Sequence, residues 1–167
     1  MQKIWGDFIA GRGAIGLLIL RVLIGAAMMQ HGWGKIQSPF NWMDLDPKRG
    51  ASGVPGILQF LAALSEFGGG AALIVGFLTP LACLGILATM TVAILMVGKG
   101  QPWIASKPGA PSFESASLYW IPAAALLFTG PGIYSLDAIL FQKERRVSSS
   151  RLSRFGVPDS SNEETPL

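Results

Sequence analysis

Four long apolar stretches constrain the fold of this chain more than any other feature of its sequence. They cover approximately residues 14–36, 57–77, 81–97 and 115–129, and the last of them is short. An α-helix rises about 1.5 Å per residue, so roughly 20 mainly apolar residues cross the hydrocarbon core of a bilayer. The lengths therefore predict an all-α fold, a four-helix transmembrane bundle within one membrane domain at residues 1–142.

The rest of the chain divides into a closing motif and a tail. Half of the 167 residues are hydrophobic and 14% are charged, which leaves little chain for a separate soluble domain. A Gly-Pro-Gly sequence at 130–132 should stop the last span, and residues 134–141 predict a short C-terminal interfacial helix capped by Ser135. Asp137 lies in its first turn, where we expect capping or packing. Residues 143–167 are basic and then rich in Ser, Pro and acidic residues, so they predict a disordered tail.

The distribution of basic residues favours a cytoplasmic location for both termini. Four spans joined in order put the termini on one side and the two longer loops on the other, and the side richer in Lys and Arg is usually cytoplasmic. The net charge of +3 comes largely from the tail that begins at Lys143, so it indicates contact with anionic lipid rather than nucleic acid. We therefore expect a multi-pass protein of the inner (plasma) membrane that has the lipid bilayer as its partner. The terminal side holds Lys3, Arg12, Lys143, Arg145, Arg146, Arg151 and Arg154, and the loop side holds Lys35, Lys48, Arg49, Lys99 and Lys107.

Ionisable side chains lie inside two of the apolar stretches. Arg21, His31 and Lys35 belong to the first stretch, and Glu66 belongs to the second. A charged side chain near the bilayer centre costs roughly 2.5 to 3.5 kcal/mol, so it normally faces a partner, a polar cavity or a ligand. These four residues are therefore the first candidates for function.

Helical periodicity predicts that the charged residues face the interior of the bundle. The first stretch carries one stripe of Arg21, Gly25, Met28, Gly32 and Lys35 with His31 beside it, and the second carries Gln59, Glu66 and Gly70. Small residues on these stripes allow close helix approach. If adjacent spans are antiparallel and centred on one plane, near Gly25 and Phe67, then Glu66 lies within reach of Arg21 and His31, and Glu114 lies level with His31. We thus expect a chain of alternating charge formed by Arg21, Glu66, His31, Glu114 and Lys35.

Several of these residues also have plain structural interpretations. Arg21 and Glu66 would serve equally as a buried ion pair that fixes helix packing. His31 is flanked by glycines and can change charge near neutral pH, which favours ligand binding or proton handling. Lys35 is expected to extend toward the lipid headgroups. Trp and Phe in the two long loops predict either a cap over a site or an aromatic belt, and Cys83 is expected to be a small buried hydrophobe.

Other chemistries have little support in the sequence. There is no Cys-x-x-Cys pair, and one histidine cannot supply a His-rich site, so no metal, haem or copper centre is expected from this chain alone. The glycines at 68–70 lie within an apolar helix and lack the strand and Lys of a phosphate-binding loop. A Ser-His-Asp catalytic set is not expected either. The single histidine lies within a membrane span, whereas Asp44 and Asp46 lie on a loop that we expect to be unconstrained.

The order of these motifs resembles the DoxX family of small four-helix membrane proteins. The similarity extends over about residues 15–140. A basic residue is common in the family where this chain has Ile133. The motifs that carry the resemblance are Arg21, Gly25, His31-Gly32 and Lys35; then Glu66, Gly69-Gly70 and Gly76-Phe77-Leu78-Thr79-Pro80-Leu81; then Gly130-Pro131-Gly132-Ile133-Tyr134-Ser135-Leu136-Asp137.

The resemblance implies a fold more firmly than an activity. Some relatives are membrane subunits of thiosulfate:quinone oxidoreductases, which implies a quinone-linked redox subunit. Arg21 or His31 would then donate to a quinone carbonyl, Glu66 would relay protons, and a partner protein would supply electrons. Glu66 and His31 are thus the candidate catalytic residues, and the wider ligand-binding set adds Arg21, Glu114 and Lys35. The alternatives are a non-catalytic membrane scaffold whose charges only fix packing and, more weakly, a small-solute transporter, suggested by Pro122 within the fourth span.

Overall fold

The computed structural model describes residues 8–45, 51–96, 99–107 and 110–141, and the predicted tail lies outside them. Residues 136–141 are helical, and the described residues contain no strand. The all-α prediction is confirmed, and the helices begin and end within three residues of their predicted bounds. The other elements are α1 (Gly11–Ile36), the 3-10 helix η1 (Trp42–Asp44), α2 (Gly56–Val75), α3 (Thr79–Met96) and α4 (Glu114–Thr129).

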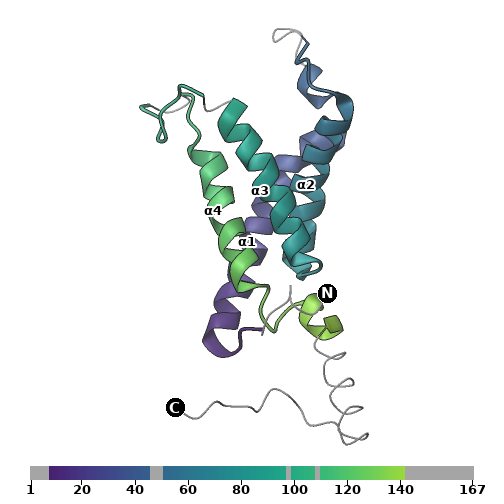
Figure 1. Ribbon diagram of the computed structural model, residues 1–167, viewed down its shortest axis with the longest axis vertical. Helices are drawn as coiled ribbons and strands as arrows, with labels where there is room; N and C mark the ends of the chain where they lie inside the picture. The colour runs from purple at the N-terminus through teal and green to yellow at the C-terminus, as the bar shows by residue number, and fades with distance from the viewer. Residues whose placement is uncertain (1–7, 46–50, 97–98, 108–109, 142–167) are drawn as a thin grey trace, which may run out of the picture.

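Three of these helices are long and apolar enough to cross a membrane. They are α1 with 26 residues, α2 with 20 and α3 with 18. α4 has 16 residues, fewer than the roughly 20 that a span needs. Figure 1 shows α3 between α2 and α4, with α1 crossing behind them. Three of the four predicted spans, α1, α2 and α3, are therefore candidates for crossing a membrane by length and composition.

α1 and α2 are held together by glycines that bring their backbones into contact. A Cβ atom on Gly25 would lie 2.6 Å from the carbonyl oxygen of Gly70, and one on Gly32 would lie 2.5 Å from the amide nitrogen of Phe67. Helices can approach this closely only where side chains are absent. The predicted inward stripes are confirmed: the buried residues include Arg21, Gly25, Met28 and Gly32 on α1 and Gln59, Glu66 and Gly70 on α2.

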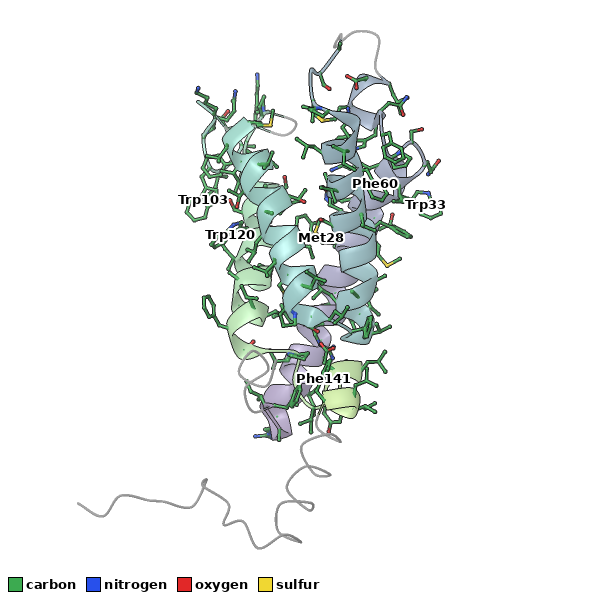
Figure 2. All side chains as sticks on the ribbon, turned by 45° about the vertical axis from the view of Figure 1, so that its right-hand side comes forward. Met28, Trp33, Phe60, Trp103, Trp120 and Phe141 are labelled. Carbon is green, nitrogen blue, oxygen red and sulfur yellow. The ribbon has the colours of Figure 1, made fainter. Side chains whose placement is uncertain are left out.

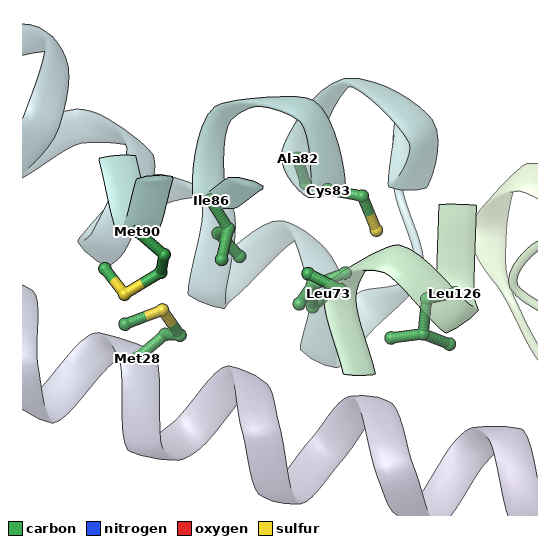
Figure 3. Packing of buried hydrophobic residues seen from close by; sticks show 8 residues of the cluster. Met28, Leu73, Ala82, Cys83, Ile86, Met90 and Leu126 are labelled. Atoms are coloured by element: carbon green, nitrogen blue, oxygen red, sulfur yellow. The ribbon is translucent and has the colours of Figure 1, made fainter. Parts of the chain in front are cut away.

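The apolar core draws on all four long helices. Met28, Leu73, Ile86 and Leu126 come from α1, α2, α3 and α4 in turn, and all are fully buried (Figure 3). Cys83 is also fully buried among them, so its prediction as a small buried hydrophobe is confirmed. Large aliphatic side chains cover the outside of the helices, which suits contact with acyl chains. Examples with more than half of the side chain exposed are Ile19, Leu23, Leu81, Leu84 and Leu95.

Glycine and proline set the ends of the helices at the terminal side. Gly76 ends α2 with a φ of 68°, a left-handed conformation that glycine adopts readily. Pro80 lies in the first turn of α3, where a missing N–H is tolerated. Gly130, with a φ of 72°, ends α4 as predicted, and its amide donates to the carbonyl of Leu126.

The aromatic residues of the loop end divide between the two predicted roles. Figure 2 shows Trp33, Phe60, Trp103 and Trp120 at about one height near that end of the helices. Trp33 and Trp103 are more than half exposed, which is typical of an aromatic belt at a membrane interface. Trp42 instead turns inward and covers Lys35, as described below. The belt stays a prediction for the exposed Trp33 and Trp103, and the cap stays a prediction for Trp42, which lies over the ammonium of Lys35.

The connection between α1 and α2 is anchored by the buried side chain of Gln59. Its Nε2 donates to Asp44 Oδ2 at 2.8 Å and to the carbonyl of Val54 at 3.0 Å, while its Oε1 accepts from the amide of Met43 at 2.9 Å. Trp42 Nε1 donates to the backbone carbonyl of Gln59 at 2.9 Å. The expectation that Asp44 lies on an unconstrained loop is therefore wrong, because a helix side chain fixes it.

We expect this loop to loosen only in acid below the ordinary aspartate range. The amide of Ser52 donates to Asp44 and lowers the pKa of its carboxyl below the usual 3.8, and Gln59 adds to the effect. A lowered folded-state pKa means that the stabilisation is complete above 3.8 and is lost as the pH falls through the folded value. Trp42 fluorescence, taken as the difference from Trp42→Phe, should change in that range. The change should be absent in Asp44→Asn, and an identical titration in that variant would contradict the assignment.

Candidate functional site

Arg21 and Glu66 do not meet, so the expected continuous chain of alternating charge is not formed. The expectation placed Phe67 opposite Gly25, whereas the structure places Phe67 against Gly32 and sets Gly25 against Gly70. The partner of Phe67 on α1 moves from position 25 to position 32, and the partner of Gly25 on α2 moves from position 67 to position 70. The two helices are therefore displaced along each other by roughly 5 to 10 Å relative to the expectation. This register leaves Arg21 at the terminal end of α2 and brings Glu66 toward Lys35.

Arg21 lies in a packed network with the closing segment of the chain. Its side chain is fully buried, and Nη2 donates to the backbone carbonyl of Tyr134. Its positive charge interacts electrostatically with Asp137. A Cβ atom on Gly76 would overlap Nη1, so the guanidinium requires a glycine at that position. Nε and Nη1 are buried without a hydrogen-bond partner among the described residues, so one hydrogen bond and the nearby charge of Asp137 hold Arg21 at this end of the bundle.

Asp137 completes this network by capping α3. Its Oδ1 accepts from the amide of Leu78 at 2.8 Å and its Oδ2 from the amide of Thr79 at 2.9 Å. Its own amide donates to the carbonyl of Gly76 at 2.9 Å. The predicted capping role of Asp137 is confirmed, although the helix that it caps is α3 and not its own.

The predicted cap of the closing helix is confirmed as well. The hydroxyl oxygen of Ser135 accepts from the amide of Ala138 at 3.1 Å, and its O–H donates to the carbonyl of Gly132 at 2.7 Å. Ser135 is buried, so neither of these bonds is exchanged freely for water.

Lys35 and Glu66 form the ion pair at the other end of the bundle. Lys35 Nζ lies 2.5 Å from Glu66 Oε1, and the two side chains are 25% and 2% exposed. The ammonium also lies 4.5 Å from the centre of the Trp42 ring, which allows a cation–π contact. The expectation that Lys35 extends to the headgroups is therefore wrong, since Glu66 and Trp42 hold it.

His31 meets a residue that the sequence analysis did not single out. Its ring packs edge-on against Tyr119 of α4, with centroids 5.0 Å apart and an interplanar angle of 76°. Tyr119 also interacts electrostatically with Glu66. A single tyrosine inside an apolar stretch is equally typical of an interface or a core, so the sequence carried no signal for this role. We refer to Lys35, Glu66, His31 and Tyr119 as the loop-side polar site.

Only one of the two carboxylate oxygens of Glu66 accepts a hydrogen bond. Oε1 accepts from Lys35, whereas Oε2 is buried and has no hydrogen-bond partner among the described residues. His31 is exposed on the same site, which leaves its ring nitrogens accessible. The arrangement can therefore both accept a hydrogen bond and donate one.

Glu114 is the remaining residue of the predicted ligand-binding set. Glu114 lies in the first turn of α4, half-buried, and makes no ion pair with any residue in the described ranges. Its place in the ligand-binding set stays a prediction. Among the described residues, no three His, Cys, Asp or Glu side chains come together to hold a metal ion.

Comparisons with known proteins agree with this architecture. The DoxX family model matches residues 16–99. The inner membrane protein YqjF of Escherichia coli (strain K12) is 32% identical over 130 residues, which cover 77% of this chain and 95% of that protein. No solved structure matches the chain significantly. Together with three helices able to cross a membrane, these similarities show that the chain is a multi-pass membrane protein and belongs to the DoxX family.

Proposed function

We propose that this protein is a quinone-linked redox subunit of the inner membrane and that the loop-side polar site binds the quinone headgroup. The single observation that carries the proposal is the buried Glu66 carboxylate, which has one oxygen paired with Lys35 and the other without a donor. A buried carboxylate oxygen without a hydrogen-bond donor lowers the stability of the folded protein. Such unpaired groups in native structures call for an explanation, and a bound ligand that supplies the missing donor is one. Electrons would come from a partner protein.

The charges of the site suit a neutral headgroup. Lys35 and Glu66 balance each other, so a ligand does not need to bring a charge of its own. His31, which is exposed, would donate to an oxygen of the headgroup, and Glu66 would exchange protons with it. The edge of Tyr119 would pack against the ring. We leave Arg21 out of this set because its contacts with Tyr134 and Asp137 hold it at the opposite end.

We also propose that α4 completes a four-span arrangement with both termini in the cytoplasm. Support comes from the position of α4 alongside α3, where Trp120 Nε1 donates to Thr91 Oγ1 at 3.0 Å. A 16-residue span requires local thinning of the bilayer or support from its neighbours. The basic residues near the termini favour their cytoplasmic location.

Titration of a short-chain quinone against the reconstituted protein tests the proposed function. Trp42 lies beside Lys35, so its fluorescence should be quenched saturably as the site fills. His31→Ala should weaken binding about tenfold, the loss expected for one hydrogen bond to the headgroup. Gln30→Ala is the matched control, because Gln30 is exposed on α1, outside the site, and it should bind as the parent protein does.

A non-catalytic scaffold is the second candidate, favoured by the direct Lys35–Glu66 pair. If the pair only fixes helix packing, no saturable quenching should appear, and Glu66→Gln should lower the thermal stability because it leaves Lys35 without its partner. Saturable binding that is lost in His31→Ala at unchanged thermal stability would exclude the scaffold in favour of the redox subunit.

A further inference from the structure

The two oxygens of Glu66 differ in a way that distinguishes between possible ligands. Oε1 accepts from Lys35 Nζ at 2.5 Å, and Oε2 is buried without a partner among the residues the structure describes. Paired with an ammonium, Glu66 is a carboxylate, and a carboxylate can only accept hydrogen bonds. What Oε2 lacks is therefore a donor.

The neighbouring groups do not supply that donor. Lys35 already donates to Oε1 and faces the Trp42 ring, and the ring of His31 is engaged edge-on with Tyr119. Glu66 is 2% exposed, so Oε2 gains a donor only from a bound molecule that displaces the side chains packed against it. A bound molecule that carries a hydroxyl group fits this acceptor, and one that carries only carbonyl oxygens does not.

Building on the proposed function, we infer that the loop-side polar site binds the reduced, hydroxyl-bearing form of its quinone more tightly than the oxidised form. The oxygens of a quinone are acceptors, whereas each hydroxyl of a quinol is also a donor. One quinol hydroxyl donates to Glu66 Oε2, and the remaining oxygens accept from His31. Because the site prefers the product of reduction, it favours reduction of the bound molecule by the ratio of the two affinities.

Three ring-matched ligands test the inference on the unmodified protein under anaerobic conditions. They are a short-chain quinone, its quinol and the dimethyl ether of that quinol, which keeps the ring but has no donor. The quinol should bind about tenfold or more tightly than either of the others, the gain expected for a hydrogen bond to a charged acceptor. Trp42 fluorescence reports binding in all three titrations.

Glu66→Gln sharpens the comparison because its carboxamide both donates and accepts. Its NH₂ group can donate to a quinone carbonyl, so the preference for the quinol should fall to about twofold or less, or reverse. Gln30→Ala, on the outer face of α1, should retain the full preference. The comparison of ligands on the unmodified protein keeps the test valid even where the Glu66 variant fails to fold.

The outcomes separate this inference from the function on which it rests. Equal or tighter binding of the quinone overturns the inference and leaves the proposed function standing. Equal binding of the quinol and its dimethyl ether also overturns it, because donation to Oε2 would then be unused. Binding of none of the three ligands overturns the proposed function itself.

Discussion

Asp137→Asn should lower the free energy of unfolding by about 2 to 3 kcal/mol, because a buried carboxylate loses one of its two bonds from backbone amides together with its charge near Arg21. Asp137 and Arg21 are both fully buried, so the arginine would retain its charge without a neighbouring carboxylate. The change also replaces one of the two oxygens that cap Leu78 and Thr79 with an NH₂ group, which cannot accept from an amide. Unfolding in mixed micelles with increasing SDS, followed by far-UV circular dichroism, measures the loss.

A double variant tests whether charge compensation causes the effect. Arg21→Met removes the charge that Asp137 balances, so adding it to Asp137→Asn should recover part of the lost stability instead of deepening the loss. Ser135→Ala provides a scale, since it removes the cap of the closing helix and the bond to Gly132 without changing any charge, and it should cost about 1 to 2 kcal/mol. Strictly additive losses from Arg21→Met and Asp137→Asn would show that the two residues act independently.

Gly32→Ala should destabilise the protein by about 3 kcal/mol, although alanine is the better helix former. A Cβ atom at position 32 would lie 2.5 Å from the Phe67 amide nitrogen and 2.9 Å from its Cα. Both contacts are with backbone, so α1 and α2 must separate, and the register that places Lys35 beside Glu66 would be disturbed. The same micelle unfolding assay measures the loss.

Gly16→Ala is the matched control on the same helix. A Cβ atom at Gly16 would meet nothing within 4 Å, so alanine should stabilise α1 by up to about 1 kcal/mol. The two substitutions are chemically identical and differ only in what faces them. A similar change in stability from both would mean that helix propensity, and not the contact between α1 and α2, decides the effect.

The sequence predicted the helices, their inward faces and the closing caps because these depend on local patterns. The stripe from Arg21 to Gly32 follows from helical periodicity, and Ser135 and Gly130 act within one turn of their own position. The family resemblance is also confirmed by the match over residues 16–99. Such features need no knowledge of how one helix is placed against another.

The axial placement of the helices could not be predicted in the same way. Centring both spans on one plane put Glu66 near Arg21, whereas backbone contact at Gly25 and Gly32 sets a register roughly 5 to 10 Å away. Tyr119 joins the site for a similar reason, since the packing of α4 brings it to His31. Each of these contacts depends on tertiary packing.

The bond from Arg21 to Tyr134 has a consequence for how the protein is made. Its two partners are 113 residues apart, so α1 enters the bilayer long before the ribosome has synthesised the segment that receives its guanidinium. Until then the nascent chain carries an arginine that has neither Tyr134 nor Asp137 beside it. A copy shortened before residue 134 would keep this arginine inside the bilayer without either partner, so α1 reaches its final environment only after the segment at 134–137 has been made.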